Sequence, residues 1–365
     1  MLHVALILGC AVVIYLACEW FVNAVEWLGV RMKVGAIAVG TVLAAAGTAL
    51  PESVVTLVAV VFGKSADSDD IGVGAALGGP LVVGTLAYGI TGAMLLWRRR
   101  QLRQRPELVA AAGVGDGGDV RTVDAHTGSA SGTNSDTDEP DVFASTDTRR
   151  LARDQTWFLV IFIGKVALGL VAFAVKPWLG LLFFAAYGVY FVRELGGGEA
   201  ASHEGLEPLK LQPKRPQPTT WAVVTQTLAT LIVIFGASQV FVHQLEWAGP
   251  ALGLPAVVVA LLLSPVATEL PEILNAIIWV RQGKVQLALA NISGAMMIQA
   301  TIPSGIGLLF TSWHFDQPLI LAGVATMASV VYLLLLMRSG KLNAARLAMC
   351  SGFYVAFAVA LAVTL

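Results

Sequence analysis

Long apolar runs separated by short polar segments dominate the chain. A helix needs about 20 apolar residues to cross the hydrocarbon core of a bilayer. Runs of this kind lie near residues 4–27, 34–62, 71–97, 156–174, 178–193, 220–244, 251–280, 285–311, 318–337 and 344–364. The pattern therefore predicts an all-α membrane protein with about ten transmembrane helices.

The composition agrees with helices that lie in lipid. Charged residues make up 13% of the chain and hydrophobic residues 56%, whereas soluble proteins carry roughly 25% charged residues. The net charge of −1 gives no basic excess, so we expect no nucleic-acid partner. The first apolar run has neither a basic segment before it nor a small-residue cleavage site, so we expect a spanning helix and not a removable signal.

Two polar segments divide the chain. Residues 98–153 contain too little apolar surface to fold alone, so they predict a disordered linker. Residues 194–218 form a second, shorter linker rich in Gly, Pro and Lys. The apolar segments then fall into two halves, the first comprising residues 1–97 and 154–193, and the second residues 219–365.

The distribution of Lys and Arg predicts the orientation. With the N-terminus outside, nine arginines between Arg98 and Arg153 fall on the inner side together with the basic residues of most other loops. Only Lys64 and Lys176 then lie outside. Cytoplasmic loops carry the Lys and Arg excess. We therefore expect a multi-pass protein of the cell membrane with both termini outside and both linkers in the cytoplasm.

The two halves are repeats of each other. Helices one and two match helices six and seven at an offset of 220 residues, and past the next loop the offset becomes 216. Because each half holds five helices, an odd number, the second half must enter the membrane from the opposite side. The matching pairs are Glu26-Trp27 with Glu246-Trp247, Thr48 with Thr268, Leu50-Pro51-Glu52 with Leu270-Pro271-Glu272, Gly78 with Gly294, and Thr85 with Thr301.

Helices two and seven carry prolines, Pro51 and Pro271, in the middle of their apolar runs. Proline removes a backbone donor and frees the carbonyl one turn earlier. Transporters built from inverted repeats bind their substrates near the midplane, where helices are broken at matching positions. We therefore expect broken helices at Pro51 and Pro271, with further breaks at Pro80 and Gly294, around a central binding site.

Two glutamates, Glu52 and Glu272, directly follow these prolines. A carboxylate at the bilayer centre costs at least ~2.5–3.5 kcal/mol, and the repeat symmetry predicts that the two face each other. A divalent cation, sodium ions or protons would relieve their repulsion. The sequence offers oxygen ligands and no nearby Cys or His, which favours a hard cation over a soft metal.

Other polar residues in the apolar runs leave alternatives open. Glu269, which has Ala49 as its counterpart, is either a cation ligand or proton carrier, or a residue of a wet vestibule. Glu26 is favoured as an interfacial anchor. Lys165 either extends its amine toward the membrane surface or pairs with a carboxylate. Three amides are each either a cation ligand or an interhelical hydrogen-bonding group, namely Asn275, Asn291 and Gln299.

At these residues the chain resembles the sodium/calcium exchanger family, the cation/calcium antiporters. The repeats of that family read G-T-S-x-P-E, followed on the next helix by G-N-x-x-G-S-N. Here the first repeat reads GTALPES and then GAALGGP, and the second reads ATELPEI and then ANISGAM. The resemblance extends over both halves, and its specific signal lies in residues 17–90 and 237–310.

The resemblance implies a secondary active antiporter that moves calcium or a related cation against sodium or protons by alternating access. Its partners would be inorganic cations and the lipid bilayer, without a cofactor, and the oligomeric state stays open. An enzyme is not expected, because neither H-E-x-x-H nor G-x-S-x-G occurs in a suitable setting. The alternative from another class is a non-transporting membrane sensor or scaffold that keeps the exchanger fold.

The resemblance also implies a set of site residues. Glu52 and Glu272 would be the central metal ligands, and Thr48 and Thr268 would contribute oxygens for calcium or sodium. Asn291 keeps the first asparagine of the second repeat. The chain departs from the motif where the family's serines fall at Ala49, Glu269, Gly79 and Ala295 and its final asparagines at Pro80 and Met296. Sodium and proton coupling therefore both stay open, as does the ion carried.

The predicted orientation can be tested in the first linker. A cysteine introduced at Ser129 should be shielded from an impermeant thiol reagent in intact cells, because the basic residues place this segment in the cytoplasm. Labelling should appear only after the membrane is permeabilised. Ready labelling in intact cells would reverse the orientation.

Overall fold

The computed structural model describes most of the chain. The described residues are 2–49, 53, 57, 60, 67–104, 143, 147–171, 175–196, 206–251, 253, 261–262 and 264–364. The ordered elements among them are helices, as the apolar pattern predicts.

The helices of the first half follow the predicted spans. They are α1 (Leu2–Met32), α2 (Ala36–Ala38) with the π-helix η1 (Val39–Ala44), α4 (Asp67–Val82) with the π-helix η2 (Val83–Ala87) and α5 (Tyr88–Gln104), α7 (Thr148–Gly169), and the 3₁₀-helix η3 (Lys176–Leu179) with α8 (Gly180–Leu195).

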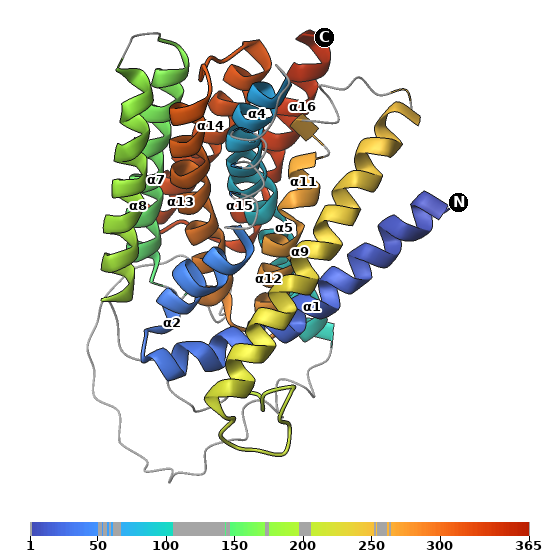
Figure 1. Cartoon of the computed structure of the whole chain (residues 1–365). Helices are drawn as coiled ribbons and strands as arrows, with labels where there is room; N and C mark the ends of the chain where they lie inside the picture. The colour runs from blue at the N-terminus through green and yellow to red at the C-terminus, as the bar shows by residue number, and fades with distance from the viewer. Residues whose placement is uncertain are drawn as a thin grey trace, which may run out of the picture.

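The helices of the second half do the same. They are α9 (Thr220–Ala251), α11 (Ser264–Thr268) with α12 (Leu270–Arg281), α13 (Val285–Phe310), α14 (Gln317–Arg338), and α15 (Ala344–Ala348) with α16 (Ser351–Thr364). In Figure 1 the α7–α8 hairpin lies on one side of the bundle, and α1 and α9 cross each other on the opposite side.

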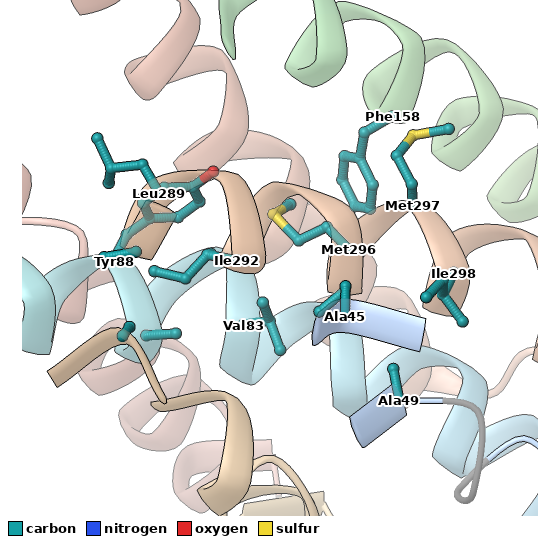
Figure 2. Packing of buried hydrophobic residues seen from close by; sticks show 14 of the residues in the cluster. Ala45, Ala49, Val83, Tyr88, Phe158, Leu289, Ile292, Met296, Met297 and Ile298 are labelled. Carbon is teal, nitrogen blue, oxygen red and sulfur yellow. The ribbon is translucent and has the colours of Figure 1, made fainter. Parts of the chain in front are cut away.

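Helix α13 is the centre of the bundle. In its most apolar stretch 89% of the residues are buried inside the protein, against 22% for the peripheral span Ala344–Thr364, which contains α15 and α16. Figure 2 shows Ile292 and Met296 of α13 beside Val83 of η2, and Met297 beside Phe158 of α7. Because polar groups on α13 are shielded from both lipid and water, those that it carries must find partners within the bundle.

The outer helices present apolar side chains outward. Val363 of α16 is 82% exposed, Ile232 of α9 72% and Val192 of α8 71%. Seven of the described helices are long and apolar enough to cross a membrane. Exposed apolar surface on this scale is stable only against lipid, so the chain is a multi-pass membrane protein.

The inverted repeat is visible in how the helices pack. A Cβ atom built on Gly294 of α13 would lie 2.2 Å from the backbone oxygen of Thr41 in η1. Its repeat partner Gly78, in α4, has the matching contact, because a Cβ there would lie 2.6 Å from Cγ of Pro265 in α11. Each half therefore brings the broken helix of the other half against its own glycine.

Polar contacts join the helix ends on the side that carries the basic residues. Glu26 is buried and accepts hydrogen bonds from the Lys284 ammonium and, at 2.8 Å, from the Trp279 indole. Arg98 donates to the Val280 carbonyl at 2.9 Å. Glu26 therefore ties α1 to α12 and α13 as a buried ion pair, and not as a solvated interfacial anchor.

The helices extend beyond the predicted linker boundaries. Helix α5 continues to Gln104 and α7 already begins at Thr148, because Arg, Leu and Gln are good helix formers. Glu194, predicted as the first residue of the second linker, belongs to α8 and is buried in an ion pair with Arg150 at 2.5 Å. The rest of the predicted disordered segment, apart from Phe143 and Asp147, lies outside the described residues.

The second linker is partly packed against the bundle. Leu209 is fully buried beside Trp27 of α1 and Val223 of α9. The Trp27 indole donates to the Glu207 carbonyl at 2.9 Å, and Asn23 accepts from the backbone of Lys210 at 3.0 Å. Residues 206–219 of the predicted second linker therefore dock on the ends of α1 and α9.

The close crossing of α13 and η1 predicts a sharp sensitivity to side-chain size. Gly294→Ala should lower the thermal unfolding temperature of the purified protein, because the new methyl group meets the rigid backbone of Thr41; overpacking of this kind costs about 1–3 kcal/mol. Gly164→Ala on α7 is the matched control, since nothing lies within 4 Å of its Cβ position. Equal unfolding temperatures for the two variants would contradict the packing.

Candidate cation site

The site is built around the break between α11 and α12. Pro271 has no N–H and stands in the first turn of α12, a position that tolerates proline and starts a new helix. Glu269 occupies the break itself, between Thr268 and Leu270. Glu272 follows in the first turn of α12. The predicted break in helix seven is therefore confirmed, and it carries two carboxylates within four residues. The breaks predicted at Pro80 and Gly294 are wrong, because α4 and α13 continue as helices through these residues.

The Glu272 carboxyl is fully buried, and neither of its oxygens has a hydrogen-bond partner among the described residues. The Thr48 side chain of the first repeat lies beside this carboxyl, while its hydroxyl donates to the Ala44 carbonyl at 3.2 Å. A buried carboxyl without partners is costly. A carboxyl in this position can bind a cation or hold a proton.

Two amides add further unpaired polar atoms beside Glu272. Asn291 of α13 donates to the Glu272 backbone carbonyl at 3.3 Å, and its own side-chain oxygen has no partner among the described residues. The side-chain nitrogen and oxygen of the fully buried Asn275 also have no hydrogen-bond partner among the described residues. Asn275 lies three residues after Glu272, on the same face of α12. These oxygens form a set that a hard cation would satisfy.

Glu269 is 1% exposed, so it does not lie in an open vestibule. The Gln299 side chain of α13 donates a hydrogen bond to it. Helix α4 comes close to the same group, because a Cβ built on Gly79 would lie 2.8 Å from a Glu269 carboxyl oxygen. Gly79, which replaces one serine of the family motif, thus leaves space for Glu269, which replaces another motif serine.

The remaining predicted residues are placed only in part. Thr268 is half-buried at the end of α11 and donates to the Pro265 carbonyl at 3.2 Å. Pro51 and Glu52 lie outside the described residues. The structure brings together Thr48, Glu272 and Asn291, while the expected meeting of Glu52 and Glu272 stays a prediction.

Lys165 behaves differently from both alternatives drawn from the sequence. Its side chain is fully buried, so it does not extend to the membrane surface. Among the described residues its amine has no carboxylate partner within 4.0 Å. Instead it donates to the Ala76 carbonyl of α4 at 2.6 Å and lies 4.5 Å from the centre of the Phe162 ring.

Sequence reasoning did not single out Asn275 and Gln299 among the amides. The spacing from Glu272 to Asn275 was a usable signal, because residues three apart share a helix face. The contact of Gln299 with Glu269 joins two helices and has no such signal. Within the described part of the chain, no three His, Cys, Asp or Glu residues gather into a metal cluster, and oxygen atoms dominate the site.

Comparisons with known proteins agree with this architecture. The profile of the family described as "Sodium/calcium exchanger protein" matches residues 2–113 and 222–363. A curated relative, the putative antiporter CaxA of Alkalimonas amylolytica, is 26% identical over 169 residues, which are 45% of this chain and 52% of CaxA. The chain thus matches about half the length of that relative.

Solved structures of the sodium-calcium exchanger NCX_Mj have the same fold. A crystal soaked with 2.5 mM Na⁺ and 0.1 mM Sr²⁺ matches with a TM-score of 0.68 at 15% identity, covering 99% of this chain and 98% of the other. A crystal soaked with 10 mM Na⁺ and no Ca²⁺ matches with the same score and coverage at 16% identity. The family profile covers both repeats and the break that holds Glu272, and the chain therefore belongs to the sodium/calcium exchanger protein family.

Proposed function

We propose that the chain is a secondary active antiporter that moves calcium or a related divalent cation against sodium or protons. The observation that carries this proposal is the Glu272 carboxyl, which is fully buried and has no hydrogen-bond partner among the described residues. Family membership, the relative named an antiporter and the exchanger fold support it. The chain is then a transporter and not an enzyme.

The proposed ligands are oxygen atoms from both repeats. Glu52 and Glu272 bind the divalent cation directly, and Thr48 and Thr268 stand four residues before them in the sequence of the two repeats. Asn291 and Glu269 belong to the set, and the Asn275 side chain, whose polar atoms have no partner among the described residues, joins it. Calcium takes six to eight oxygen ligands in a flexible arrangement, which suits a site made of carboxylates, hydroxyls and amides on broken helices.

The proposed substrate explains why unpaired groups are retained. A carboxyl and two amides without partners destabilise a buried site. A bound divalent cation offsets that cost by contacting Glu272 and the oxygens of Asn275 and Asn291 at once. A sensor or scaffold that keeps only the fold has no need of these groups, and no observation on the described residues favours it.

Alternating access is proposed to arise from movement of the α1–α9 pair. The two helices pack along each other at the edge of the bundle, away from α13 (Figure 1). At one end of the pair, the ring of His3 on α1 and the side-chain oxygen of Gln244 on α9 form a hydrogen bond of 2.6 Å. The pair is tied to the remaining helices at the other end through Glu26 and Lys284. Sliding of this pair would have to break the contacts of Glu26 with Lys284 and Trp279 and the hydrogen bond from Arg281 to Tyr15.

The proposed placement is the cell membrane, with both termini outside and both linkers in the cytoplasm. The helix ends that carry Arg98, Arg150, Arg281, Lys284 and Arg338 would then face the cytoplasm, in agreement with the excess of basic residues on that side.

The carboxylate pair gives the sharpest test of the proposed function. Glu52→Gln and Glu272→Gln should each weaken calcium binding by at least about 100-fold, because losing one close charge contact is worth several kcal/mol even at an effective dielectric of about 20 and each ~1.4 kcal/mol is tenfold. Calorimetry on the purified protein measures the affinity, and the repeat symmetry predicts similar losses for both variants.

The matched control is Glu19→Gln. Glu19 lies on α1, accepts from the Tyr15 hydroxyl at 3.0 Å and pairs with Lys210 at 3.5 Å, away from the site. Its loss should leave calcium affinity unchanged. If both site variants bind calcium as the parent does, the glutamates are structural. A parent protein that binds no cation would favour the scaffold.

A further inference from the structure

The group with no role so far is Lys165, whose amine is fully buried in α7. An ionisable side chain at membrane depth is costly and is commonly functional. Its contacts are a backbone carbonyl and an aromatic ring. Neither of these compensates a full positive charge as a carboxylate would.

The carbonyl that Lys165 contacts is free because of the sequence of α4. Pro80 lies inside this helix and has no N–H, so the carbonyl of Ala76, four residues earlier, lacks its helical donor. Lys165 donates to this carbonyl at 2.6 Å. In the second repeat Met296 stands at the matching position and keeps its N–H, so the carbonyl of Ile292 is not freed.

The same turn of α4 reaches the carboxylates of the site. Gly79, three residues after Ala76, lies against Glu269 and Gln299. Lys165 thus contacts Ala76, while Glu269 lies against Gly79 in the same turn of α4. A change in the hydrogen bond between Lys165 and Ala76 would therefore act on the part of α4 that packs against Glu269.

We propose that Lys165 is the proton-coupling residue of this antiporter: its ammonium holds the α4 turn at Pro80 through a charge-assisted hydrogen bond to the Ala76 carbonyl, and this bond weakens to that of a neutral amine when the proton leaves for water. The inference rests on the proposed function. A lysine amine can lose its proton when it is buried, unlike a guanidinium, which stays charged. The released proton then moves against the cation, and no sodium ion is required.

Two ionisable groups among the described residues lie next to the α4 turn at Pro80: Lys165, which contacts Ala76, and Glu269, which lies against Gly79. Helix α13 contains no ionisable side chain. Helix α14 carries Tyr332 and Arg338 toward its far end, and α7 carries its own Asp154 and arginines three turns away. The acidic residues of α4 are in its first turn, Asp67 to Asp70. Lys176 donates to the backbone carbonyl of Trp313, whose indole contacts the Lys165 backbone, and Asp316 caps the start of α14.

A purely structural account is weaker. The freed carbonyl needs one donor, and a neutral amide or hydroxyl would supply it without burying a charge. The indole of Trp313 donates to the Lys165 carbonyl at 3.1 Å, which fixes the backbone here and helps hold the side chain inside. The position therefore keeps an ionisable group where an uncharged donor would suffice.

The test uses the full-length protein in proteoliposomes, with radioactive calcium uptake driven separately by a pH gradient and by a sodium gradient. The parent should respond to the pH gradient and not to sodium. Lys165→Gln keeps an N–H donor for the Ala76 carbonyl but has no proton that it can release. It should bind calcium within roughly threefold of the parent and lose pH-driven uptake by at least about tenfold.

A second variant and a control complete the experiment. Lys165→Arg keeps a permanent charge and should lose pH-driven uptake in the same way, even if the glutamine variant folds poorly. Lys176→Gln is the matched control, because Lys176 also donates to backbone carbonyls, those of Val171 and Trp313 at 2.8 and 3.0 Å. The Lys176→Gln variant should keep the pH-driven calcium uptake of the parent.

The outcomes separate this inference from the proposed function. If the parent binds calcium and either Lys165 variant retains full pH-driven uptake, Lys165 is only a structural donor and the inference fails alone. Uptake by the parent that follows sodium and ignores pH overturns it as well. If the parent binds and transports no cation, the proposed function itself fails.

Discussion

The arrangement of this protein depends on one constraint, the cost of polar groups at membrane depth. Hydrocarbon offers no hydrogen bonds, so each buried donor and acceptor must find a partner inside the bundle. Most do so here, and Glu26 even forms an ion pair with Lys284. Among the described residues, buried side-chain atoms without hydrogen-bond partners occur on α7, α8 and α9 as well as on α12 and α13. Those of Glu272, Asn275 and Asn291 lie close together beside the helix break at Glu269, and this grouping supports the proposed site.

Proline creates the second feature on which the site depends. Pro271 divides α11 from α12 and leaves Glu269 in the break and Glu272 in the next turn. Pro80 frees a carbonyl within α4, and Lys165 takes it. The two repeats thus use the same device for different ends, one to present carboxylates and the other to hold a lysine. The departures from the family motif are concentrated where this asymmetry arises.

Small residues let the broken helices approach the centre. Gly294 and Gly78 each admit backbone or proline atoms of the other repeat at distances that no larger residue allows. Gly79 does the same for Glu269. Because close packing has little spare volume, the glycines fix where each broken helix lies relative to α13. The positions of the carboxylates follow from these contacts.

The sequence alone determined the helices, the repeat and the break at Pro271, because apolar run length, a fixed offset and proline chemistry are local properties. It also predicted Glu272, Thr48 and Asn291 as site residues, since an intramembrane carboxylate and the family motif mark them, and the structure brings these three together. Tertiary structure decided the partners: Gln299 for Glu269, Lys284 for Glu26, and the Ala76 carbonyl for Lys165. These contacts join residues far apart in the chain, and helix crossings that no local pattern encodes bring them together.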